Sequence, residues 1–176
     1  MYRPSYARNR SIYIQSNIMK KIQLAVILFI SLISQNIFAQ STPTTTTSPL
    51  LSAYFGVKNA LVAGNSSDAN GHALQMIEAI HMLDSLKVTA NAYDELLVDA
   101  THISKSKDIN HQREHFARLS TNMYAVAKVI KLSSEPIYYD YCPMKKSYWL
   151  SNNSAIKNPY YGSQMLTCGK VSETLK

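Results

Sequence analysis

The chain has 176 residues, a formal net charge of +7 and a hydrophobic fraction of 46%, which are ordinary values for one globular domain. Of the 18 basic residues, five lie in the first 39 positions, whereas none of the 11 acidic residues does, so the remainder carries only +2. This small charge argues against nucleic acid as a partner, because nucleic-acid binding requires a clustered basic face on the folded domain.

The first 39 residues have the layout of a secretory signal peptide. A short basic start at residues 19–21 precedes an almost wholly apolar run over 22–32, and the small residue Ala39 stands at the expected cleavage position. We favour Met19 as the true start of the chain. The apolar run is shorter than the roughly 20 residues that cross a bilayer, so no stable membrane insertion is expected after cleavage. The mature protein is predicted to be soluble and periplasmic, a compartment that permits disulfides.

The next segment, residues 40–49, is rich in Thr and Pro and is predicted to be a flexible linker. From residue 50 onward, apolar residues recur at helical spacing in four segments. The first is about Leu50–Ala63 and ends at the turn residues Gly64 and Asn65. The second begins after the cap candidates Ser67 and Asp68 and reaches about Leu83. The third is about Asn91–Ser104, and the fourth is Asp108–Leu132, with Asp108 as its candidate cap. Each segment has an apolar stripe that needs a partner, and the connections are short. We therefore predict an up-down four-helix bundle.

After Ser133 the helical periodicity stops, because prolines and glycines interrupt it. This C-terminal segment is dense in aromatic residues, which are Tyr138, Tyr139, Tyr141, Tyr148, Trp149, Tyr160 and Tyr161. Large rings can supply burial without regular structure. We therefore expect an irregular, ordered loop layer packed against the bundle, an all-α fold class, and a single domain over residues 50–176.

Four sulfur-containing side chains in this C-terminal segment are candidate metal ligands: Cys142, Met144, Met165 and Cys168. Thiolates and thioethers select soft ions such as Cu(I), and by the same chemistry Ag(I). One proline separates Cys142 from Met144, and Met165 and Cys168 are spaced i, i+3. The alternative is a Cys142–Cys168 disulfide, which closes a loop of 27 residues and stabilises the fold by about 3 to 4 kcal/mol. The methionines are then packing residues, and no metal is bound.

Histidines supply a further candidate ligand. His111 and His115 lie one turn apart on the fourth predicted helix and could hold a metal together, with His115 pointing toward the C-terminal segment. Such a pair is more commonly solvent-facing. His72, His81 and His102 lie singly and are interpreted as surface or boundary residues.

Enzymatic motifs are not evident in the sequence. It contains no CxxC, CxxCH, HExxH or Gly-rich phosphate loop, and nothing places a Ser, a His and an acid together. We therefore do not expect an enzyme.

The C-terminal segment reads as an aromatic stretch, Cys-Pro-Met, Trp-Leu-Ser, Ile-x-Asn-Pro-Tyr-Tyr-Gly, Met-Leu and Cys-Gly. The residues of this pattern are Tyr139, Cys142, Pro143, Met144, Trp149, Leu150, Ser151, Ile156, Asn158, Pro159, Tyr160, Tyr161, Gly162, Met165, Leu166, Cys168 and Gly169. With Arg113, His115 and Phe116 in the helices, the pattern resembles domain-of-unknown-function family 3347. These are small exported domains found alone or fused to periplasmic adaptor subunits of heavy-metal efflux pumps in Gram-negative bacteria.

The resemblance implies copper or silver homeostasis in the periplasm, with an efflux adaptor as a partner. Two hypotheses follow for the function. One is a soft-metal binding protein for Cu(I) or Ag(I) that is linked to heavy-metal efflux. The other is a disulfide-stapled interaction module that docks on an envelope or adaptor protein and binds no metal.

Overall fold

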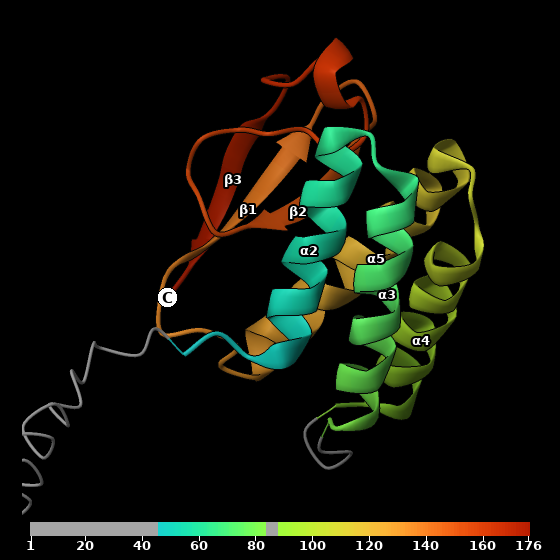
Figure 1. Ribbon diagram of the computed structural model, residues 1–176. Coiled ribbons are helices and arrows are strands. Elements are labelled where there is room, and N and C mark those ends of the chain that lie inside the picture. Colours follow the sequence, from blue (N-terminus) through green and yellow to red (C-terminus); the bar gives the residue numbers. More distant parts are fainter. Residues whose placement is uncertain (1–45, 84–87) are drawn as a thin grey trace, which may run out of the picture. The chain divides into compact units, whose positions relative to one another are not determined.

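The computed structural model describes residues 46–83 and 88–176, so the predicted signal peptide and most of the predicted linker lie outside the described residues. Four helices come first along the chain: α2 (Pro49–Ala63), α3 (Ser66–His81), α4 (Ala90–Lys105) and α5 (Ile109–Val129). They are followed by β1 (Ile137–Cys142), β2 (Ser147–Ser151), the short 3-10 helix η1 (Gly162–Gln164) and β3 (Lys170–Leu175). In Figure 1, α3 lies between α2 and α4, and the strands lie on the other side of α2.

Capping side chains explain where the helices begin. The Ser48 hydroxyl accepts a hydrogen bond from the Leu51 N–H at the start of α2. At the start of α5 the predicted cap is confirmed, because the Asp108 carboxylate accepts from the Asn110 N–H at 2.8 Å. The cap of α3 is Asn65 rather than one of the predicted residues.

The helices end close to their predicted ends. Gly64 ends α2 in the left-handed conformation, with φ of 75°, which favours glycine. The last predicted helix is three residues too long, because α5 ends at Val129 and Ile130 is already extended. All four predicted helices are therefore present, each within a few residues of its predicted bounds.

The predicted all-α fold class is wrong, because the C-terminal segment forms a three-stranded antiparallel sheet in the order β2-β1-β3. Strand β1 pairs with β2 from Tyr138–Ser151 to Cys142–Ser147. Aromatic and β-branched residues, which dominate β1, are good strand formers. The proline that suggested irregular structure, Pro143, lies in the connection between β1 and β2, where it removes no sheet hydrogen bond. Lys146 completes this connection with a positive φ of 56°.

The aromatic side chains join the sheet to the helices. The Tyr54 hydroxyl of α2 is 2.7 Å from the Ser120 hydroxyl of α5 and accepts a hydrogen bond from the Leu150 N–H of β2 at 2.9 Å. On α5, the ring of Tyr124 stacks on Tyr139 of β1 with centroids 3.9 Å apart. Because these contacts are buried or stacked, the sheet and the helices share one hydrophobic core.

The segment before α2 is tied to the domain. Thr47 forms an isolated bridge with Ser133, and the Ser48 N–H donates to the Leu132 carbonyl at 2.8 Å. Among the helices of residues 46–83 and 88–176, none has the length and hydropathy that crossing a bilayer requires.

Candidate metal centre

The two cysteines, 26 residues apart in the sequence, lie side by side in the structure. Cys142 ends β1, and the antiparallel pairing of Tyr141 with Lys170 brings the residues just before β3 to this end of the sheet. The Cys142 thiol and the backbone of Met144 lie close enough to the Cys168 thiol to shift its pKa. Both cysteines are free thiols, and Cys142 is buried. The sheet thus gathers the cysteine pair that the sequence suggested.

Backbone and side-chain N–H groups surround the Cys142 sulfur. The buried Asn158 amide donates to Cys142 Sγ at 3.2 Å and to the Cys168 carbonyl at 2.7 Å, so one side chain holds both cysteine segments. The Lys145 N–H donates to Cys142 Sγ at 3.4 Å. Such donors can compensate the negative charge of a metal-bound thiolate. Burial first, and the neighbouring Cys142 second, raise the pKa of the Cys168 thiol.

The two methionine side chains lie at the surface. Met144, in the connection between β1 and β2, is 61% exposed, and Met165, just after η1, is 40% exposed. The Cys168 N–H donates to the Met165 carbonyl at 3.0 Å, so this i, i+3 pair forms a single turn. The backbones of both methionines are thus close to Cys168, and the methionine side chain has several rotatable bonds.

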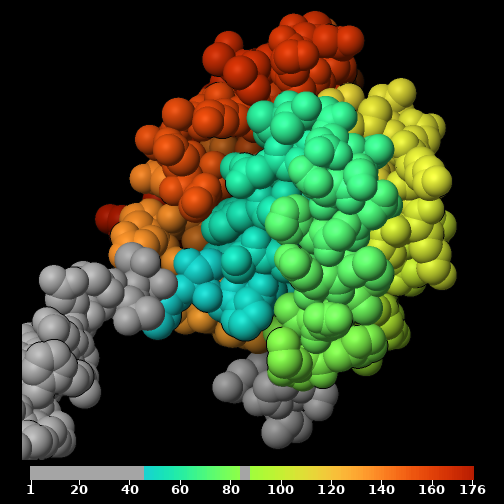
Figure 2. Space-filling model, in the orientation of Figure 1, coloured from blue at the N-terminus to red at the C-terminus, as the bar shows by residue number. Residues whose placement is uncertain are grey.

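Arg113 of α5 fixes the C-terminal segment on the helices. Its Nε donates to the Pro159 carbonyl at 2.9 Å, and its Nη2 donates to the Leu61 carbonyl near the end of α2 at 3.1 Å. In Figure 2, the segment around η1 lies against the C-terminal end of α2. The chain turns between Asn158 and Gly162, where the Gly162 N–H donates to the Asn158 carbonyl at 3.1 Å.

The histidines form a separate cluster between α4 and α5. His102, His111 and His115 each offer a ring nitrogen, and these atoms lie within 4.8 Å of one another. The rings of His102 and His115 stack with centroids 4.0 Å apart, and the rings of His111 and His115 are 4.5 Å apart. The predicted pairing of His111 and His115 is therefore present, but His115 faces α4 rather than the C-terminal segment. A cluster of this kind can hold a metal ion.

His102 is the cluster member that the sequence interpretation missed. Only residues 106–108 connect α4 to α5, so the two helices form a tight helical hairpin. In such a hairpin, residues at similar distances before and after the connection face each other. His102 and His111 fit this relation, and the short connection between their helices was the available signal.

The structure also buries two opposite charges that are not in hydrogen-bonding contact. Asp140 of β1 is fully buried, and among the described residues neither of its carboxylate oxygens has a hydrogen-bond partner. Burial raises its pKa to about 7, and the nearby Lys58 opposes this shift. Lys58 of α2 is itself 3% exposed, and burial lowers its pKa to about 8.

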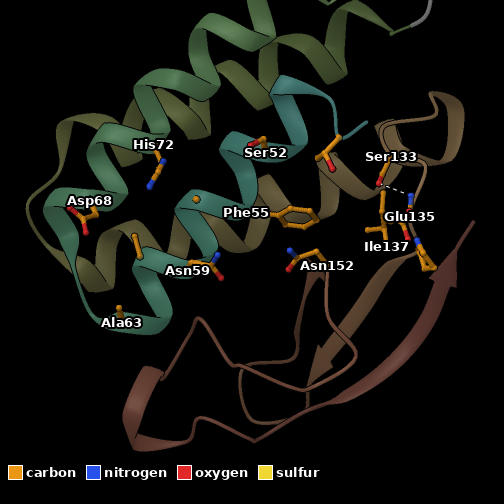
Figure 3. Close-up of a pocket in the computed structure, with 14 residues that line it drawn as sticks. Ser52, Phe55, Asn59, Ala63, Asp68, His72, Ser133, Glu135, Ile137 and Asn152 are labelled. Carbon is orange, nitrogen blue, oxygen red and sulfur yellow. Dashed lines mark hydrogen bonds between the residues drawn. The ribbon is translucent and has the colours of Figure 1, made fainter. Parts of the chain in front are cut away.

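A wide pocket of about 680 Å³ lies between α2, α3 and the chain before β1. Figure 3 shows Phe55 and Asn59 of α2, His72 of α3 and Asn152 around it. Its described lining contains neither cysteine and none of the clustered histidines. The pocket is thus distinct from both groups of candidate ligands.

The comparison with protein families concerns the helices. Residues 50–135 match the family described as "Protein of unknown function (DUF3347)", a range that ends before β1. The cysteines and methionines of the C-terminal segment lie beyond the matched range. Among curated proteins and among solved structures, no match was found. Through residues 50–135, the chain belongs to the family described as "Protein of unknown function (DUF3347)".

Proposed function

We propose that this domain binds a soft monovalent metal ion, Cu(I) or Ag(I), through Cys142 and Cys168, with Met144 and Met165 as additional ligands. The observation that carries the proposal is the strand pairing of Tyr141 with Lys170, which makes the two thiols near neighbours although they are distant in the sequence. Two adjacent thiolates suit a soft cation, whereas water and carboxylates do not compete well for it.

The surroundings of the sulfur pair support binding rather than catalysis. Two thiolates and one Cu(I) leave one negative charge, and the N–H groups of Asn158 and Lys145 that donate to Cys142 reduce the energetic cost of burying that charge. The exposed thioethers can complete the coordination from the solvent side. Because they are exposed, they also provide a route by which a partner could receive the ion.

The closeness of the two thiols also favours a second candidate function. Oxidation of Cys142 and Cys168 to a disulfide would staple the end of β1 to the start of β3 and remove both thiolates. The domain would then be an interaction module without metal. The oxidation state of the two cysteines in protein isolated from its own cell distinguishes the two functions.

The sequence also supports a proposal for location and partner. The layout of residues 1–39 supports export to the periplasm, and the resemblance supports a periplasmic adaptor of a heavy-metal efflux pump as the receiver of the ion. Mass spectrometry of the periplasmic fraction tests the first point, and an N-terminus close to Gln40 is the expected result.

The proposal is tested by titrating the reduced mature protein with Cu(I) in competition with a chelator. We expect uptake of about one equivalent, loss of most uptake in Cys142→Ser and Cys168→Ser, and weaker binding in Met144→Leu and Met165→Leu. Leucine conserves volume and hydrophobicity, so folding is retained. Met82→Leu is the matched control, because Met82 is 70% exposed at the end of α3.

Each result of the titration separates the possible ligands. Parent-like affinity in both cysteine variants would contradict the proposal. Parent-like affinity in both leucine variants would restrict the ligands to the two thiols.

A further inference from the structure

We propose that His102, His111 and His115 form a second metal site, for a divalent first-row transition ion such as Zn²⁺ or Cu²⁺. This site is separate from the sulfur pair and does not depend on the function proposed for it. Imidazole nitrogens are the ligands that these borderline ions prefer, and no thiol takes part in the cluster.

The nitrogens are already close to the positions that one ion requires. Ligands of a tetrahedral zinc ion at 2.0–2.1 Å lie roughly 3.3 Å from one another. The three candidate nitrogen atoms lie within 4.8 Å of one another. Side-chain rotations that move each nitrogen by about an ångström would bring them to the separations of a zinc site. The backbone need not move, because His111 and His115 are one turn apart on α5 and His102 is held opposite them on α4.

A buried carboxylate orients the central ligand. Asp99 of α4 is 3% exposed, and its Oδ1 lies 2.8 Å from Nδ1 of His115. If Nδ1 carries the hydrogen, the carboxylate accepts it and Nε2 keeps a free lone pair for the metal. Ligating histidines commonly donate their second ring N–H to a carboxylate in this way, which fixes the tautomer and raises the basicity of the ligand.

Arg118 of α5 competes for the same atoms. Its Nη2 lies 2.8 Å from Asp99 Oδ1 and 2.7 Å from His115 Nδ1. Donation from Arg118 to Nδ1 would select the other tautomer, in which Nε2 carries the hydrogen and cannot ligate. Metal binding through Nε2 and this donation are therefore mutually exclusive, and ligation through Nε2 requires His115 to donate to Asp99.

The position of the cluster leaves one side of the ion accessible. A pocket of about 290 Å³ opens beside it, lined by His102, His111, Thr101, Lys105 and Ser106. His102 is exposed and His115 is buried, so the ion would enter from the solvent past His102 and bind His115 at the inner side of the site. Three protein ligands with an open fourth position leave room for water or for a ligand from a partner.

The test uses the mature chain with Cys142→Ser and Cys168→Ser, so that the sulfur pair cannot bind the ion. Isothermal titration with Zn²⁺ measures affinity, and the visible absorption of bound Co²⁺ reports nitrogen ligation in a tetrahedral site. We expect about one equivalent in each case. The unsubstituted chain is titrated in parallel, and its Cu(I) uptake is scored separately, so that failure of one site is distinguishable from failure of the other.

Single substitutions assign the ligands. His102→Ala is the primary variant, because this exposed side chain can be removed without disturbing the core, and we expect a loss of affinity of at least tenfold. Asp99→Asn should lower affinity by about 10- to 100-fold, the usual effect of removing such an orienting carboxylate. Arg118→Ala should leave affinity unchanged or raise it, because it removes the competing donor. His81→Ala is the matched control, because His81 contacts Tyr93 instead of the cluster.

Zn²⁺ affinity that is unchanged in His102→Ala and in Asp99→Asn would overturn the proposal, as would the absence of tetrahedral Co²⁺ absorption in the folded parent. Circular dichroism of each variant verifies the fold.

Discussion

Replacing Asp140 by Asn should change how the stability of the domain depends on pH. The carboxyl group is fully buried beside Lys58, and burial raises its pKa from 3.8 to about 7. A raised pKa means that the folded state binds this proton more tightly than the unfolded state does. The contribution to stability is therefore largest below pH 4 and is lost as the pH rises to about 7. Above pH 7 the carboxylate is ionised in both states, and its burial remains unfavourable.

The magnitude follows from the shift of the pKa. About three units at 1.36 kcal/mol each correspond to about 4 kcal/mol in the free energy of unfolding between pH 4 and pH 7. The pKa of Lys58 is lowered to about 8, so its own effect lies between about pH 8 and 10.5, outside this window. Urea denaturation of the parent and of Asp140→Asn from pH 4 to pH 8 measures the difference. As the pH rises, the free energy of unfolding of the parent should fall by several kcal/mol relative to that of the variant. If the free energies of unfolding of the two proteins depend on pH in the same way, this description of the buried carboxyl group is refuted.

Three further substitutions test how the C-terminal segment is attached to the helices and how it packs internally. Tyr54→Phe should lower the free energy of unfolding by about 2 kcal/mol in urea denaturation, because the buried Leu150 N–H loses its acceptor; an unchanged midpoint would contradict the link. Arg113→Gln should cost about 1.5 to 3 kcal/mol and expose the C-terminal segment to limited proteolysis, because two carbonyls lose a charged donor; parent-like resistance would count against the anchor. Gly169→Ala should lower the melting temperature, because Gly169 has a φ of 152° and an added methyl group would lie 2.8 Å from the Trp149 ring; a melting temperature equal to that of the parent would be the opposite result.

The helical half of the fold could be predicted because its pattern is local. Apolar residues at 3.6-residue spacing, the cap at Asp108 and the turn at Gly64 each depend on neighbours in sequence. The bounds of the helices were accordingly close to those observed. The end of α5 was misplaced because Ile130 and Leu132 continue the apolar pattern after the backbone has become extended.

The sheet could not be recognised from helix-breaking residues alone. Pro143 and Gly169 were interpreted as signs of irregular structure, yet one lies in a turn and the other just before a strand. Aromatic runs on both sides of a proline-containing turn are also typical of a hairpin, and this pattern was available. The pairing of β1 with β3, in contrast, joins residues that are 29 (Tyr141 and Lys170) to 38 (Ile137 and Leu175) positions apart, and no local pattern specifies it.

Some of the candidate ligands could likewise be predicted from the sequence, and others depend on tertiary packing. The closeness of Cys142 and Cys168 was expected from their residue types, and the strand pairing provides it. The role of Asn158 depends on a buried contact that has no sequence signature. His102 depends on the packing of α4 against α5, so it was treated as a single residue.

X-ray absorption spectroscopy at the copper edge tests the central claim most directly. The sample is the reduced mature protein loaded with one equivalent of Cu(I). Ligation by Cys142 and Cys168, with or without the methionines, predicts a first shell of sulfur neighbours alone. A first shell of nitrogen with the outer-shell scattering of imidazole would contradict the claim, because it would place Cu(I) at the histidines rather than at the sulfur pair.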